Sequence, residues 1–249
     1  MFDKASMLRR VNGESVLLLG GGRALLMQLA HPLVARGVAE HSHFEAAPLR
    51  RLVRTLRPVY AVGFGSAGQA AGAASTVRAR HRGVVGAGYS ALDPGLGMWV
   101  HATLVDSALV TYERFVRPLE ARERTAYYLE MQRLGEMFGV PRASQPAGVA
   151  AFETYVASMV GTLDVSAEAR RLAASVFATR PWELAPLTVA SRWVTAGLLP
   201  PRLRAGYGLR WSSVDERLLS GVAATCRIGV PMLPRRLRRP PAFLMPREV

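Results

Sequence analysis

Helical spacing of apolar residues runs through most of this 249-residue chain, and it restricts the fold more than any other feature. Ala, Leu, Arg, Met and Glu fill long segments, whereas the alternating β-branched runs that are typical of strands are rare. Half of the residues are hydrophobic, which is enough for a sizeable core. The sequence therefore predicts an all-α fold, a single large helical bundle over residues 1–249, in which residues 181–249 form a C-terminal helical covering segment of the same domain.

Turn residues divide the periodic pattern into separate helices. Asp93-Pro94-Gly95 stands before one predicted helix, and Ser166 is a plausible N-cap for another. The predicted helices are Arg23–Ala30, Pro32–His41, Leu49–Arg57, Gly68–Val85, Leu96–Val116, Ala121–Phe138, Ala147–Val160, Ala167–Phe177, Trp182–Thr195, Pro200–Tyr207 and Val214–Ile228.

The formal net charge of +14 raises the question of a nucleic-acid partner. Lys4 is the only lysine, and the arginines are spread along the chain without an aromatic-interleaved basic block before the last twenty residues. We therefore expect no specific nucleic-acid binding. The arginines at positions 235, 236, 238 and 239 leave two alternatives open, a solvated tail and a peripheral contact with an anionic membrane surface.

Other classes are restricted by what the chain lacks. The single cysteine, Cys226, excludes an intramolecular disulfide and any Cys-based metal cage. No uncharged apolar run reaches the length of a membrane span, and Met1–Gly13 lacks the apolar core of a secretory signal, so we expect a cytoplasmic protein. Glycines 20 to 22 are followed by neither Lys-Ser nor Lys-Thr, which argues against a phosphate loop.

The five histidines all lie within the first 101 residues, and two of them occupy central positions in predicted helices. His81 follows Ala70, Ala74 and Val77 at helical spacing, so its imidazole should face the bundle interior. A neutral imidazole in such a place can bind a metal through one nitrogen. The alternative is a hydrogen-bonded core histidine, and the residues alone leave both open.

His101 is the second inward-facing histidine, in register with Leu104 and Ala108. It is a candidate second ligand, proton carrier or hydrogen-bonding support, with a purely structural role as the alternative. His41 ends a predicted helix, where a cationic imidazole favours the helix dipole. Each of these two histidines therefore keeps a functional and a structural reading.

Arg51 and Thr55 stand four residues apart and therefore on one helix face. A buried arginine needs an anion, such as the propionate of a haem or a bound carboxylate, and the threonine hydroxyl can donate to the same anion or to bound oxygen. An ordinary, partly exposed pair is the alternative.

Several of these residues belong to an ordered set of motifs that resembles the catalytic domain shared by MpaB-type oxygenases and the latex-clearing rubber oxygenases. The resemblance spans nearly the whole chain. Its motifs are Arg23-Ala-Leu-Leu-Met-Gln-Leu-Ala-His-Pro32, His41-Ser42, Pro48-x-x-Arg51-Leu-x-x-Thr55, Val77-x-x-x-His81, Tyr89-x-Ala91-x-Asp93-Pro94, Trp99-Val-His-Ala-Thr-Leu104, Tyr127-Tyr128-x-Glu130, Gly139-Val-Pro141 and Pro200-x-x-x-Arg204-x-x-Tyr207-Gly.

The resemblance implies a haem b-dependent oxygenase that uses dioxygen to cleave a carbon–carbon double bond in a small lipophilic, isoprenoid-like alkene. It implies that His81 is the iron ligand and that Arg51, Thr55 and His41 line the cofactor pocket. Arg51 and Thr55 would also act in catalysis, with His101 in a supporting role. Two other readings remain: a lipid or small-hydrophobe carrier without haem, and a basic module that interacts through its C-terminal arginines.

Overall fold

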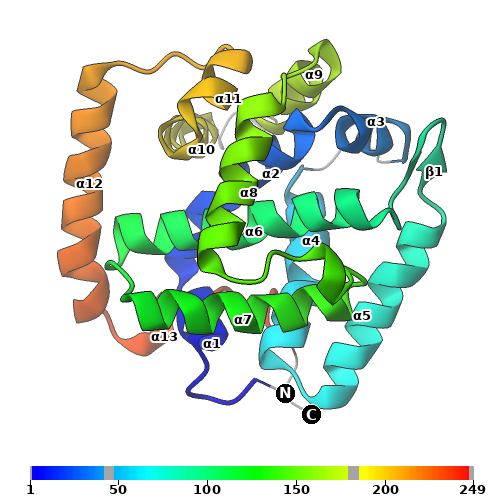
Figure 1. The fold of residues 1–249 in the computed structure, drawn as a ribbon. Coiled ribbons are helices and arrows are strands. Elements are labelled where there is room, and N and C mark those ends of the chain that lie inside the picture. The colour runs from blue at the N-terminus through cyan, green and yellow to red at the C-terminus, as the bar shows by residue number, and fades with distance from the viewer. Residues whose placement is uncertain (1, 42–47, 179–184, 247–249) are drawn as a thin grey trace.

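The structure is a computed structural model that describes residues 2–41, 48–178 and 185–246, without the side chains of residues 48–52. Within these ranges it contains thirteen α-helices, two 3-10 helices and one two-stranded antiparallel sheet, which confirms the predicted all-α fold (Figure 1). Whether the chain is a single domain stays a prediction.

Helix α6 (Pro94–Phe115) is the axis of the molecule and crosses its centre (Figure 1). Asp93 caps it, because its carboxylate accepts a hydrogen bond from the Leu96 amide, and Pro94 takes the first turn, where no amide donor is needed. Trp99 is fully buried and donates from Nε1 to the Met27 carbonyl oxygen at 3.1 Å. The helix is therefore held by core contacts along most of its length.

Half of the other helical elements in the described ranges pack on this axis. The elements that pack on α6 are α1 (Met7–Asn12), η1 (Ser15–Gly20), α2 (Gly21–Ala30), α7 (Ala121–Met137), η2 (Arg142–Ser144), α8 (Val149–Thr162) and α12 (Ser213–Met232). The remaining helices of the bundle are α3 (Pro32–His41), α9 (Ala167–Val176), α10 (Ala185–Leu198), α11 (Pro201–Gly206) and α13 (Arg235–Arg238). In α9, Ser166 caps the helix as predicted, because its hydroxyl accepts from the Ala169 amide.

The glycines that open α2 allow close helix packing. A Cβ on Gly22 would lie 2.0 Å from the Thr195 hydroxyl oxygen of α10, and one on Gly20 would lie 2.3 Å from the Thr111 hydroxyl oxygen of α6. Neither position has room for a side chain. These glycines therefore serve contacts between helices, in agreement with the argument against a phosphate loop.

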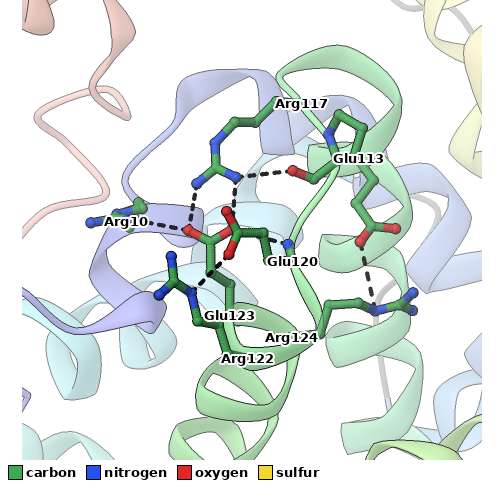
Figure 2. Close-up of polar contacts among 8 residues, drawn as sticks. Arg10, Glu113, Arg117, Glu120, Arg122, Glu123 and Arg124 are labelled. Carbon is green, nitrogen blue, oxygen red and sulfur yellow. Dashed lines mark hydrogen bonds and ion pairs between the residues drawn. The ribbon is translucent and has the colours of Figure 1, made fainter.

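An ion-pair cluster joins α1, the end of α6 and the start of α7 (Figure 2). Arg117 makes a bidentate contact with Glu123, with both N–O distances at 2.7 Å, and Arg10 adds a third contact to the same carboxylate at 3.1 Å. The hydrogen bonds from Arg117 lower the pKa of Glu123 to about 2. The cluster ties the N-terminal helix to the bundle through charged groups as well as apolar contacts.

Helices α4 (Pro48–Phe64) and α5 (Ala67–Arg82) pack against each other as a hairpin with a short turn. Ser66 and Gln69 form a reciprocal capping box that starts α5. The chain then forms a small sheet of β1 (Val85–Gly86) and β2 (Tyr89–Ser90) before it enters α6. In Figure 1, α5 and β1 lie at the edge of the molecule, opposite α12.

Several predicted boundaries were wrong. Two helices were expected to end near a proline, but α4 continues through Pro58 and α12 through Pro231. A proline removes one helical hydrogen bond, and the flanking turns keep the helix intact here. The expected helix end at Val85 was too late, because the chain caps at Gly83 and then enters β1, and neither α1 nor the sheet was predicted. Trp182, the predicted start of another helix, lies outside the described residues.

No single helix in the described ranges has the length and apolarity to cross a membrane. One bent pair, Ser15–Ala30 with Pro32–His41, meets the length and composition requirement only when its two parts are taken together, and they meet at 103°.

Candidate functional site

His81 lies in the last turn of α5, not at the helix centre as predicted, because α5 ends at Arg82. The face on which it lies is the predicted one. Ala70 and Ala74 on that face are buried, while Val77 and His81 towards the C-terminal end are half-buried. The inner face of α5 thus becomes more open towards the end that carries the histidine.

The imidazole of His81 is in the neutral form, which a metal ligand requires. Burial lowers its pKa, which keeps the ring neutral near pH 7. Among the described residues, no hydrogen bond occupies either of its ring nitrogens. A neutral imidazole with a free lone pair can bind a metal ion or haem iron.

The hairpin brings the predicted Arg51 position to the same end of the molecule. Arg51 in α4 and His81 in α5 stand at almost equal sequence distances from the turn between Gly65 and Ser66. Because both helices rise equally per residue, the two positions lie at similar heights along the hairpin. The side chain of Arg51 is outside the described part, whereas Thr55, one helical turn closer to the turn, is exposed.

His101 has a different environment, because it is buried between α6 and α7. Its imidazole donates to the backbone carbonyl of Met131, and Nε2 has no hydrogen-bond partner. A Cβ on Gly135 would lie only 2.9 Å from this Nε2, so the ring is packed directly on the backbone of α7. Burial lowers the pKa of His101 to about 4. The contact with Gly135 leaves no space for a flat cofactor on that side.

His41 contacts the small sheet. Its Nε2 is 3.1 Å from the Val85 carbonyl oxygen, and its ring meets the edge of Tyr89 with 6.2 Å between ring centroids. The Tyr89 hydroxyl in turn donates to the carboxylate of Glu40, which raises the pKa of Tyr89 to about 12. His41 is exposed and holds α3 to the sheet through these contacts.

A buried polar group that the sequence did not single out centres on Arg23 of α2. Its guanidinium is 2.6 Å from the Asp106 carboxylate, and it donates to the Ser107 hydroxyl and to the Leu198 carbonyl, both at 2.8 Å. This one side chain therefore links α2, α6 and α10. The sequence signal for this group was the Asp106-Ser107 pair on the same helix as His101. A buried arginine requires polar partners, and a carboxylate next to a hydroxyl on an inward-facing helix can provide them.

A cleft of about 370 Å³ lies where the start of α6 meets α3, α8 and the sheet. Its lining residues are His31, Leu33, Gly88, Tyr89, Asp93, Gly95, Leu96, Tyr155 and Met159. Nδ1 of His31 is buried without a hydrogen-bond partner, and burial lowers the pKa of this histidine, against the opposing effect of Asp93. The lining of the cleft is mainly apolar, and His31, Tyr89 and Asp93 supply polar groups.

The described residues contain no group of three His, Cys, Asp or Glu side chains that could hold a metal ion. A bound haem needs only one protein ligand to its iron. His81 fits that requirement, because its ring is neutral, half-buried and without a hydrogen bond in the described part of the chain. His101 fits less well because Gly135 closes off its free nitrogen.

These features define an all-α protein with a single-histidine candidate for a cofactor ligand. A family model described as "ER-bound oxygenase mpaB/B'/Rubber oxygenase, catalytic domain" matches residues 8–228. The chain therefore belongs to this family of oxygenase catalytic domains, which confirms the resemblance seen in its motifs.

Two relatives cover most of the chain. The uncharacterized protein Rv2237 of Mycobacterium tuberculosis and the uncharacterized protein Mb2261 of Mycobacterium bovis are each 29% identical to it over 225 residues. Each alignment covers 85% of this chain and 88% of the relative. No solved structure matches the chain significantly.

Proposed function

We propose that this protein is a haem b-dependent oxygenase that cleaves a carbon–carbon double bond of a small lipophilic, isoprenoid-like alkene. The family supplies the oxygenase activity, and the reaction balances with dioxygen alone, because one O₂ and one C=C bond give two carbonyl groups. The observation that carries the proposal is the neutral, half-buried imidazole of His81 without a hydrogen bond in the described structure.

Each predicted residue has a defined task in this proposal. His81 holds the haem iron, and its burial keeps the ring unprotonated and available. Arg51, at a similar height on α4, pairs with a haem propionate, since a guanidinium forms strong hydrogen bonds with a carboxylate. Thr55 provides a hydroxyl on the same face of α4. When bound, the haem supplies the iron at which dioxygen is activated.

The packing of His101 and His41 assigns them supporting parts in the proposal. His101 fixes α6 against α7, and His41 fixes α3 against the sheet that follows α5. Both therefore position the helices around the α4–α5 hairpin and need not touch the haem. The cytoplasmic location stays a prediction.

The test is haem retention by protein expressed with a haem precursor, measured by the Soret band and by iron content. We expect about one haem per chain in the wild type and none in His81→Ala. His31→Ala is the matched control, because His31 is also a partly buried histidine whose pKa is lowered by burial. Haem loss in His31→Ala with normal retention in His81→Ala would move the ligand assignment to the cleft.

Activity is tested separately on the haem-loaded protein with an isoprenoid alkene. Dioxygen uptake should equal the alkene consumed, and mass spectrometry should find carbonyl products that carry both oxygen atoms. A haem-loaded protein that leaves several isoprenoid alkenes unchanged would contradict the substrate class, but not the ligand assignment.

A second function, a carrier of small hydrophobic molecules without haem, is favoured by the cleft. Leu33, Leu96, Tyr155 and Met159 give it an apolar wall, and its volume of about 370 Å³ lies in the range of small-molecule sites. A colourless, iron-free wild type that co-purifies with a stoichiometric lipid would support this function over the oxygenase. Loss of that lipid in Leu96→Glu would then locate it in the cleft.

A further inference from the structure

Helix α12 is apolar on two opposite faces, and only one of them packs on the protein. Leu219 and Ala223 are buried against α6 and α10 in a small core around Phe115. The outward side of the helix carries a stripe of exposed aliphatic side chains, in which Val214, Leu218 and Val222 follow one another at intervals of four residues and Ile228 and Met232 form a second pair at the same interval. A surface helix normally turns its apolar face inwards and presents a polar one to solvent.

The stripe is free of charge and is placed at the outside of the molecule. Thr225 and Gly229 lie between its aliphatic members, and a Cβ on Gly229 would meet nothing within 4 Å. Figure 1 shows α12 as the outermost helix on its side of the bundle. Ile228 is 71% exposed and Met232 is 79% exposed, which is unusual for two apolar neighbours on one helix face.

The segment that follows adds positive charge. From Leu233 to Pro246 the chain contains four arginines, and from Arg217 to Pro246 it contains no acidic residue. Arg238 is bound to the Glu14 carboxylate, and Arg227 donates to the Glu113 carbonyl. The exposed arginines of α13 and its C-cap are Arg235, Arg236 and Arg239, and they flank Leu237, which is 66% exposed.

We propose that the outer face of α12 together with α13, here called the α12–α13 surface, binds peripherally to an anionic lipid bilayer. Its members are Val214, Leu218, Val222, Ile228, Met232, Arg235, Arg236, Leu237 and Arg239. The aliphatic stripe enters the boundary between headgroups and acyl chains, and the arginines pair with anionic headgroups. The proposal does not depend on haem binding.

Charge and apolarity together favour a bilayer over other partners. A second copy of this chain would bring the same uncompensated arginines together, which costs energy. A nucleic acid would attract the arginines but would leave the aliphatic stripe in water. A bilayer with anionic lipid is the partner that satisfies both parts of the surface.

The test is flotation of the full-length protein with vesicles of phosphatidylcholine and phosphatidylserine in equal parts, and with vesicles of phosphatidylcholine alone. We expect binding to the mixed vesicles that weakens as salt increases. The double variant Ile228→Ser with Met232→Ser should lower the vesicle affinity on the order of tenfold or more. The triple variant Arg235→Gln, Arg236→Gln, Arg239→Gln should lower it on the order of a hundredfold at low salt.

Matched controls use the same substitutions elsewhere. Leu187 and Val189 of α10 are 65% and 67% exposed, and their double serine variant should bind vesicles like the wild type. The glutamine triple variant of the exposed arginines Arg133, Arg171 and Arg192 has the same charge change and should lose far less affinity. Circular dichroism checks that each variant is folded.

Three results would overturn the proposal. The wild type could fail to float with the mixed vesicles. Both control variants could lose as much vesicle affinity as the variants of the α12–α13 surface. The affinity would then depend on net charge and total exposed apolar area, not on this surface. The serine double variant could keep its vesicle affinity but be monomeric where the wild type is dimeric; the surface would then join two copies of the chain.

Discussion

The two inward-facing histidines lie in regions that are packed very differently. His101 belongs to the α6 core, where Trp99 is fully buried and the backbone of Gly135 lies against the imidazole. His81 belongs to the α4–α5 hairpin, where α5 buries only Ala70 and Ala74. The backbone of Gly135 closes off the free nitrogen of the core histidine, whereas the histidine of the hairpin is half-buried and makes no hydrogen bond among the described residues. Both histidines point inwards, so the direction of the side chain does not identify the candidate site. The ring nitrogens that neighbouring residues leave accessible do.

The free energy of unfolding should differ most between the two regions when one arginine is replaced in each. Arg23→Met leaves Asp106 without its partner inside the core, and we expect a loss of about 3–4 kcal/mol in the free energy of unfolding. Arg78→Met on the hairpin should cost less than about 1 kcal/mol, because this exposed guanidinium donates to the Met137 carbonyl and has no ion pair among the described residues. Urea denaturation measures both values.

The double variant Arg23→Met with Asp106→Leu provides the check on the cause. It removes both charges, so most of the lost stability should return. If the double variant is no more stable than Arg23→Met, the lost free energy comes from packing and not from an unpaired carboxylate.

The pH dependence of stability should depend on the core histidine. Burial lowers the pKa of His101 to about 4 from its usual value of 6.5, so the unfolded chain binds this proton first. Stability should therefore fall by about 3 kcal/mol as the pH drops from about 6.5 to about 4, with no further loss from this group below that range. Thermal unfolding across this range measures it.

His101→Gln is the matched control, because glutamine does not titrate. Its stability should vary much less over the same pH range than that of the wild type. An equally steep fall in His101→Gln would assign the pH dependence to other groups, such as His31 or His81, whose pKa values burial also lowers.

A single substitution made in both regions compares their packing directly. Val105→Ala in α6 removes two methyl groups from a fully buried site and should cost about 2–3 kcal/mol. Val77→Ala in α5 acts on a half-buried side chain and should cost less than about 1 kcal/mol. Equal losses in the two variants would show that the hairpin is packed as tightly as the core.

The sequence predicted the helices well and the site only in part, for reasons that particular residues show. Local signals placed a helix start at Asp93-Pro94-Gly95 and identified Ser166 as a cap, because capping depends on neighbours within three residues. Spacing showed that both His81 and His101 face inwards, but it could not show which ring is closed off. That distinction depends on Gly135, a residue of another helix.

For other residues, the sequence could not predict a role that depends on a hydrogen bond to a distant part of the chain. The role of Arg23 depends on a carbonyl of α10, and that of His41 depends on a carbonyl in a sheet too short to give a strand pattern. Arg51 and His81 were grouped through the resemblance, and the α4–α5 hairpin places both near one end. The roles of these residues towards a haem stay predictions.

The ion-pair cluster at the start of α7 should contribute less than any buried group. Glu123→Gln should cost about 1 kcal/mol at pH 7, because Arg117 is partly exposed and water screens the pair. The pKa of Glu123 is lowered to about 2 from 4.5, so its contribution is present above about pH 4.5 and is lost as the pH falls towards 2. Glu136→Gln, an exposed site on the same helix, is the control and should change stability little.

The smallest effect on stability, with the largest effect on function, is expected at His81. In the haem-free protein, His81→Ala should change the free energy of unfolding by less than about 0.5 kcal/mol, because its imidazole makes no hydrogen bond in the described structure. His101→Ala should cost about 2–3 kcal/mol, because it leaves a cavity and removes a buried hydrogen bond. Urea denaturation of both variants without haem, followed by haem titration, measures both properties. A His81→Ala protein as unstable as His101→Ala would make His81 a structural histidine, and any loss of haem would then follow from unfolding.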